Sequence, residues 1–180
     1  MPVTNRHRTP RVSHDGAYAA VVIRSGLLGH ELWLEDLNNS ERVRLVMEGS
    51  DNRSPAWTAD GQLSFASNRL GPQNIFVTRL TSNETRHLIK TPSAQNPGGW
   101  AVDGRLAYYE VGRLDRNVLV RTNDGTIIPI AVTDANERSP TWSVDGAWLA
   151  YVSDENGFDQ VYVQPYPPDG NRIIVSPSGG

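Results

Sequence analysis

The sequence contains no cysteine. A disulfide framework, a thiolate nucleophile and a cysteine-ligated zinc site are therefore excluded, although the absence does not fix the compartment. No apolar run approaches the roughly 20 residues that a membrane-spanning helix needs, and the opening segment 1–8 has no apolar core of the kind found in a signal peptide. For the chain as given we predict a cytoplasmic location without membrane insertion, or a periplasmic one if it is part of an exported parent.

Catalytic and nucleotide-binding motifs are also missing. There is no Gly-x-Ser-x-Gly elbow and no phosphate-cradling glycine loop, and the four histidines show no metal-ligand spacing. A net charge of −3 with dispersed basic residues argues against nucleic-acid binding. We therefore predict no catalytic residue, no metal, no cofactor and no nucleic-acid partner, and a protein that is not an enzyme.

The residues that are present favour many short strands. Hydrophobic residues make up 38% of the chain, 16 glycines and 12 prolines supply turns, and no window has sustained helical periodicity. One segment is written four times, with an Asp-Gly pair every 42 to 45 residues. A period of this length is typical of a four-stranded β-propeller blade.

Each copy contains the same series of predicted strands. A Pro/Trp segment comes first, the Asp-Gly turn follows, and then come two apolar strands and a short last strand. The second strands are expected at 19–22, 63–66, 106–109 and 149–152, the third at 32–34, 75–77, 118–120 and 161–163, and the last near 43–46, 87–89, 127–130 and 173–175. The third strands are apolar at every position, which predicts cover on both faces.

The pattern resembles the TolB-type β-propeller repeat, whose signature is Pro-x-Trp-Ser-Pro-Asp-Gly. The match is carried by segments 54–61 and 139–146 and by the loops 67–69 and 153–155. The second proline of the signature is replaced in all four copies, and the first copy lacks the tryptophan, so the first blade is weakly specified. The resemblance implies an all-β propeller, and such propellers occur as binding proteins, sensor modules and gating domains of serine peptidases.

Four complete repeats fit the chain, at about 8–50, 51–93, 94–135 and 136–178, and we expect one propeller domain over 1–180. Propellers of this family are typically six- or seven-bladed, so a four-blade arc would leave apolar blade faces open. Three solutions remain: a closed four-bladed ring, a homodimer that completes an eight-bladed ring, or a fragment of a longer chain.

Binding residues are expected in the loops between the second and third strands and in the joins between blades, because these loops differ from copy to copy and lie on one rim. Three arginines stand four places before the Trp position, at Arg8, Arg53 and Arg138. Their guanidinium groups suit carboxylate or phosphate groups. Arg69 and Asp154 in the neighbouring loops complete the candidate ligand-binding set. The alternative is that each arginine pairs with a local acid, such as Asp51 or Glu137.

The repeated aspartates and tryptophans are expected to be structural. An Asp before Gly accepts hydrogen bonds within a turn, while Gly takes the positive φ that the turn needs. The tryptophans are expected to wedge between blades. The set consists of Asp15, Asp60, Asp103, Asp145, Trp57, Trp100 and Trp142.

Three functions remain open. The first is a non-catalytic binding or scaffold module that presents the loops of one rim to a protein or a small anionic ligand. The second is an accessory, gating propeller of a larger enzyme such as a prolyl oligopeptidase-type peptidase. The third is a propeller enzyme acting on a glycan.

Overall fold

The computed structural model describes residues 7–25, 29–45, 51–82 and 84–179, and for residues 7–9 the backbone alone. The chain divides into two compact units, residues 1–92 and 93–180. No described residue belongs to a helix long and apolar enough to cross a membrane.

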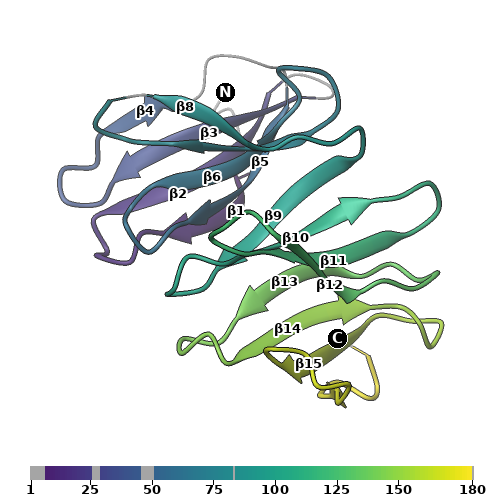
Figure 1. The fold of residues 1–180 in the computed structure, drawn as a ribbon. Coiled ribbons are helices and arrows are strands. Elements are labelled where there is room, and N and C mark those ends of the chain that lie inside the picture. The colour runs from purple at the N-terminus through teal and green to yellow at the C-terminus, as the bar shows by residue number, and fades with distance from the viewer. Residues whose placement is uncertain (1–6, 26–28, 46–50, 83, 180) are drawn as a thin grey trace. The chain divides into compact units, whose positions relative to one another are not determined.

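Unit 1 contains two four-stranded sheets, which we call blades 1 and 2 (Figure 1). In each, the strands are antiparallel and lie side by side in chain order. The strands are β1 (His7–Val12), β2 (Tyr18–Ser25), β3 (Gly29–Asp36), β4 (Arg42–Arg44), β5 (Asn52–Trp57), β6 (Leu63–Ser67), β7 (Asn74–Thr78) and β8 (Thr85–Ile89).

Unit 2 repeats the arrangement as blades 3 and 4. Its strands are β9 (Ala94–Trp100), β10 (Leu106–Val111), β11 (Arg116–Arg121), β12 (Ile127–Ala131), β13 (Arg138–Trp142), β14 (Trp148–Ser153), β15 (Gln160–Pro165) and β16 (Ile173–Ile174). The expected fold class, an all-β propeller of four four-stranded antiparallel blades, is confirmed. Among the expected strand ends, Val46 lies outside the described residues.

Within each unit, the two blades pack face to face. In unit 1, Ala20 and Leu34 of blade 1 belong to one buried cluster with Trp57, Leu63 and Phe65 of blade 2. In unit 2, the corresponding cluster joins Ala107, Val118 and Val120 of blade 3 to Leu149, Tyr151 and Tyr162 of blade 4. Each fully buried large side chain contributes about 1.5–3 kcal/mol, so this contact is the main source of stability in each unit.

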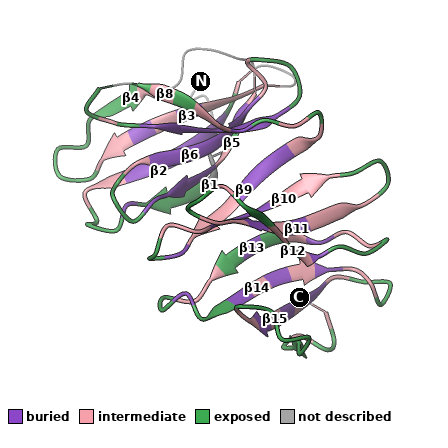
Figure 2. Ribbon diagram, in the orientation of Figure 1, coloured by how far each residue is buried: buried purple, intermediate pink, exposed green. Residues whose placement is uncertain are grey.

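The third strands differ in how far they are covered. All five residues of β7 are buried, as expected from its apolar sequence (Figure 2). Over the apolar positions of β3, β11 and β15, buried and half-buried residues alternate, so one face is less covered than the other and the expectation of cover on both faces was wrong there. The physical reason is that an apolar strand loses water on both faces only where both faces have a neighbour.

The prolines of the repeat lie where the first strand breaks register. Between Arg53 and Ala56, two residues of β5 stand opposite one residue of β6, and the same irregularity occurs in β13. Ser54 and Ser139 take the positive φ values of 54° and 55° there, and Pro55 and Pro140 follow them. A β-bulge of this kind tolerates proline, because the residue needs no ladder hydrogen bond.

The Asp-Gly turns share one hydrogen-bond pattern in blades 1, 2 and 4. A hydroxyl two residues before the aspartate donates to its Oδ1, over 2.6 Å from Ser13, 2.5 Å from Thr58 and 2.5 Å from Ser143. The same hydroxyl accepts a hydrogen bond from a backbone N–H at the start of the second strand. The donors are Tyr18, Gln62 and Trp148. All four following glycines have positive φ, between 69° and 88°.

These hydrogen bonds keep the turn aspartates ionised. Donation from Ser13 and then Ala17 holds the pKa of Asp15 below its ordinary value of 3.8, and Thr58 and then Gln62 do the same for Asp60. In blade 3, where Ala101 replaces the hydroxyl residue, Arg105 lowers the pKa of Asp103 instead.

We predict that Gly98→Ala destabilises the protein by about 2–3 kcal/mol, because the added Cβ would lie 2.2 Å from the carbonyl oxygen of Pro140 and 2.6 Å from its Cγ. Gly99→Ala is the matched control, since its Cβ would meet no atom closer than 3.8 Å. Urea denaturation of both variants is the measurement, and equal losses would contradict the close packing of β9 on β13.

We predict that Asp60→Asn lowers the free energy of unfolding by about 1 kcal/mol at pH 7. The folded pKa lies below the unfolded value of 3.8, so the carboxylate stabilises the fold above that value and loses the effect as the pH falls through the folded pKa. The difference between wild type and variant should therefore shrink in urea titrations well below pH 3.8. A difference that is constant with pH would contradict the assignment.

Candidate functional site

Each sheet has two chemically different ends. The Asp-Gly turns and the turns between third and fourth strands lie at one end, which we call the turn end. The loops between second and third strands and the joins from blade 1 to blade 2 and from blade 3 to blade 4 lie at the other, the loop end. This follows from the antiparallel order of the strands.

At the loop end of unit 1, Asp51 is the centre of a polar network. Its carboxylate lies 2.8 Å from Nδ1 of His30 and 2.8 Å from the Arg53 guanidinium, and it accepts a 2.9 Å hydrogen bond from Nε2 of Gln73. Its backbone N–H donates to the side chain of Asn68 over 3.1 Å. The join between blades is thus tied both to blade 1 and to the loop of blade 2.

The loop end of unit 2 has an equivalent network. The backbone N–H of Asn136 donates to Asp154 over 2.8 Å, and its side-chain amide donates to the other oxygen of that carboxylate over 2.9 Å. These bonds, the backbone one first, hold the pKa of Asp154 below its ordinary value. Arg138 pairs with Asp159. A shallow hollow of about 520 Å³ lies here, lined by Asp154 and by residues 133–135, 155 and 157.

The structure places the candidate arginines in different surroundings. Arg53 pairs with Asp51, one of the acids proposed from the sequence, and 44% of its side chain remains exposed. Arg138 pairs with Asp159 rather than with its neighbour Glu137. The guanidinium of Arg69 lies over the rings of Phe65 and Phe76 at 5.3 and 4.7 Å, so much of its side chain serves packing. The side chain of Arg8 lies outside the described residues.

Two of the three repeated tryptophans lie between blades of one unit. Trp57 is buried, and its indole N–H donates to the backbone oxygen of Arg11 in blade 1 over 2.8 Å. Trp142 of blade 4 packs in the cluster shared with blade 3 and meets the Tyr166 ring edge-on, at 5.1 Å between centroids. Trp100 is half-buried at the end of β9.

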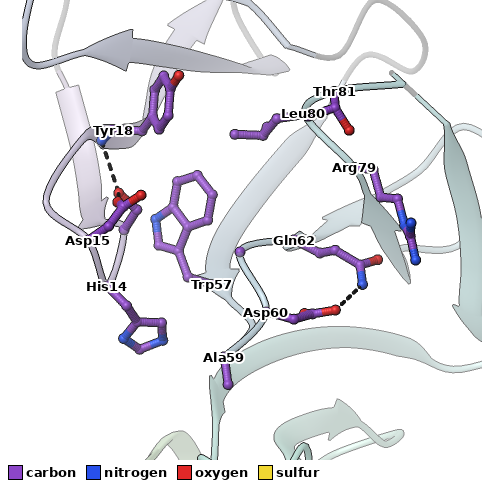
Figure 3. A pocket seen from close by; sticks show the side chains of 12 residues that line it. His14, Asp15, Tyr18, Trp57, Ala59, Asp60, Gln62, Arg79, Leu80 and Thr81 are labelled. Atoms are coloured by element: carbon purple, nitrogen blue, oxygen red, sulfur yellow. Dashed lines mark hydrogen bonds between the residues drawn. The ribbon is translucent and has the colours of Figure 1, made fainter.

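A groove at the turn end of unit 1 is a feature that the sequence analysis did not find. It has a volume of about 630 Å³ and runs between the Asp-Gly turns of blades 1 and 2. Figure 3 shows the Trp57 indole with Tyr18 and Asp15 on one side and Leu80 and Gln62 on the other. The motif alone indicates a structural role for both turns, and a hollow between two turns depends on side-chain sizes at positions that the motif does not include.

The turn end of unit 2 is filled by a side chain. The guanidinium of Arg105 lies 4.6 Å from the centre of the Trp142 ring and 4.2 Å from that of Tyr166. It also donates to both carboxylate oxygens of Asp103 over 2.8 Å and to the backbone oxygen of Gly146 over 2.9 Å. Arg105 thus joins blade 3 to blade 4 by stacking and by hydrogen bonds.

Among the described residues, no group of three or more histidine, cysteine, aspartate or glutamate side chains could hold a metal ion. The histidine side chains that the structure describes have different surroundings. His14 lines the groove, His30 contacts the carboxylate of Asp51, and His87 stacks on Phe76 at 4.5 Å between ring centroids. Burial lowers the pKa of His87.

Comparison with known proteins gives two related sequences, both Tol-Pal system protein TolB. The one from Desulfosudis oleivorans is 27% identical over 111 residues, which are 59% of this chain and 24% of that protein. The one from Hydrogenovibrio crunogenus is 36% identical over 84 residues, 44% of this chain and 19% of that protein. No family model matches the chain.

Solved structures agree on the fold. The crystal structure of TolB from Acinetobacter baumannii has a TM-score of 0.80 at 17% identity and covers 94% of this chain, which corresponds to 43% of that protein. A puromycin hydrolase has a TM-score of 0.73 at 18% identity over 94% of this chain and 29% of its own. The chain thus spans less than half of either protein.

The repeated turns, the strand order within each sheet and these similarities agree with one another. The chain is built from β-propeller repeats of the TolB type.

Proposed function

We propose that this chain is a non-catalytic binding module that presents its loop ends to a protein partner. The observation that carries the proposal is the repeated hydrogen bond across the loop end, from Asp51 to Asn68 in unit 1 and from Asn136 to Asp154 in unit 2. It holds a charged loop of variable sequence against a rigid sheet before any partner arrives. Loops fixed in this way lose little entropy on binding.

Acidic groups are the partner chemistry that the loop ends favour. Arg53 keeps almost half of its side chain exposed, and Arg138 keeps 30%, although each already contacts one carboxylate. A guanidinium has five donors, so one carboxylate leaves donors for another. We propose an acidic segment of a protein as the partner, with a small anion as the alternative ligand.

The similarity to Tol-Pal system proteins supports this function over catalysis. It also supports the periplasmic alternative for the compartment, as part of an exported parent, over the cytoplasmic one.

A second proposal is favoured by the structural similarity to peptidases. The chain matches a prolyl endopeptidase with a TM-score of 0.68 over 28% of that protein, as well as the puromycin hydrolase. The chain would then be the accessory propeller of a larger enzyme, and catalysis would lie outside these residues. A hydrolase-coding segment next to these repeats in the source gene would support this function, and a gene without one would favour the binding module.

One face of blade 4 supports the pairing of two copies. Trp148 is 42% exposed, Ile173 and Val175 are each 55% exposed, and Val161 and Val163 are half-buried beside them. The equivalent faces of blades 1 and 3 are covered by the aromatic side of the next blade. We propose that a blade of a second copy covers this apolar face, because burying it removes apolar surface from water.

We predict that replacing Arg53 and Arg138 together by Ala weakens binding of an acetylated tetraglutamate peptide at least tenfold, because each lost charge-assisted hydrogen bond is worth about 1.5–3 kcal/mol. The melting temperature should change little, since exposed ion pairs contribute about 0–1 kcal/mol. Isothermal titration calorimetry and thermal denaturation measure the two effects.

A tetraglutamine peptide is the neutral control, and citrate tests the small-anion alternative. Arg86→Ala, at an exposed arginine of β8 near the turn end, is the matched control variant. Unchanged peptide affinity in the double variant would overturn the proposed role of the arginines. A large loss of stability would show that they are structural.

We predict that the wild-type chain has twice its monomer mass in light scattering at micromolar concentration and that Trp148→Asp has the monomer mass. The aspartate would place a charge on the apolar face without touching the buried cluster of unit 2. Val144→Asp, at a 98% exposed residue of the neighbouring turn, is the control and should still pair. A monomeric wild type would contradict the pairing.

A further inference from the structure

The groove of unit 1 and the arginine of unit 2 occupy the same place in the repeat. Val12 pairs with Ala19 in blade 1, as Trp100 pairs with Leu106 in blade 3. Tyr18 and Arg105 stand directly before those paired residues, so they are equivalent positions.

The residues around them are equivalent as well. Trp57 of blade 2 corresponds to Trp142 of blade 4, because each pairs with the first buried leucine of its second strand. By the same register, Leu80 corresponds to Tyr166. The turn residues Asp15 and Gly61 correspond to Asp103 and Gly146.

In unit 2 these positions form a complete receptor for a guanidinium group. The cation lies against both rings, which meet edge-on, while Asp103 accepts the Nε–H with both of its oxygens and the carbonyl of Gly146 accepts an N–H of Nη2. Stacking on aromatic rings combined with paired hydrogen bonds is the interaction that distinguishes arginine from lysine.

In unit 1 most of the receptor is present without its guanidinium, and Leu80 stands where Tyr166 provides a ring in unit 2. Tyr18, Trp57, Leu80, Asp15 and Gly61 all line the groove, where they correspond to the residues that hold or supply Arg105. Trp57 provides one ring, and Tyr18 replaces the arginine itself with a second ring. Figure 3 shows both rings and the Asp15 turn around the same space.

The charges that line the groove favour a cation. Asp15 and Asp60 are both held ionised by their turn hydrogen bonds, and the remaining titratable groups are Arg79, His14 and Tyr18. Because Gln62 donates to Asp60 over 2.6 Å, that carboxylate is partly used, and Asp15 is the better acceptor for a ligand. Arg79 opposes a second cation at the Gln62 side, which favours a ligand with a single guanidinium.

We propose that this groove binds a guanidinium group, supplied by an arginine side chain of a protein partner or by a small guanidine, stacked on Trp57 and hydrogen-bonded to Asp15 and the carbonyl of Gly61. The site lies at the turn end, away from Arg53. It therefore does not depend on the proposed function of the loop end.

The test is a titration followed by NMR at the indole N–H of Trp57, assigned with Trp57→Phe. The probes are butylguanidinium and butylurea, which have similar shapes and differ in charge. We expect saturable shifts with butylguanidinium and roughly tenfold weaker binding of butylurea, because the cation–π contribution is lost. Equal affinities for the two probes would overturn the proposal.

Tyr18→Arg should supply the guanidinium from within and abolish binding of butylguanidinium, as Arg105 does in unit 2. Tyr18→Gln is the matched control, because blade 2 has Gln62 at this position, and it should keep the site open. Retained binding in a folded Tyr18→Arg variant would count against the site.

Leu80→Tyr gives a second measurement that does not depend on the folding of Tyr18→Arg. It restores the ring that Tyr166 provides in unit 2, so it should tighten binding of butylguanidinium severalfold, and an unchanged or weaker affinity would contradict the proposed geometry. An acetyl-Gly-Arg-Gly-amide peptide, compared with butylguanidinium, distinguishes the sources. Tighter binding of the peptide supports a protein arginine, and tighter binding of butylguanidinium supports a small guanidine.

Discussion

The contact between the faces of neighbouring blades is the interaction on which each unit depends. One blade contributes small and aliphatic residues such as Ala20 and Val22, and the next contributes large ones such as Trp57 and Phe65. Unit 2 repeats this asymmetry with Ala107 facing Leu149 and Tyr151. A sheet with one apolar face cannot be stable alone in water, so each blade requires its neighbour. Blade 4 has the same requirement, and in the proposed pairing a blade of the second copy meets it.

The asymmetry of the faces also decides where hollows form. The cores are filled, but at the turn end the gap between blades is closed only by the side chain at the position of Tyr18 or Arg105. Where that side chain is an arginine, it is held by rings and a carboxylate, and the gap is closed. Where it is a tyrosine opposite Leu80, a groove remains. A change of two residues in the repeat thus separates a structural contact from a candidate binding site.

Most of the fold could be predicted from the sequence, because the Asp-Gly period and the apolar triplets specify the order of the strands and which loops lie at the same end of each sheet. The positive φ of the turn glycines also follows from the motif. The turn hydroxyls Ser13, Thr58 and Ser143 also have a signal in the sequence, because each stands two residues before the aspartate of its turn.

The candidate site was less predictable, for two reasons. The partner of an arginine depends on which loops meet in space, so the pairing of Arg138 with Asp159 instead of Glu137 has no signal in the order of residues. The groove can be recognised only by comparing the residues at equivalent positions of different blades. That comparison needs the register, in which blades 1 and 4 have one more residue after the turn than blades 2 and 3.

The prolines in the first strands have a consequence for association. Pro10, Pro55, Pro97 and Pro140 each stand where the ladder changes register, so the first-strand edge of each sheet lacks a continuous row of N–H donors. A foreign strand cannot extend the sheet at such an edge, which protects this edge from the edge-to-edge aggregation to which exposed β-sheets are prone.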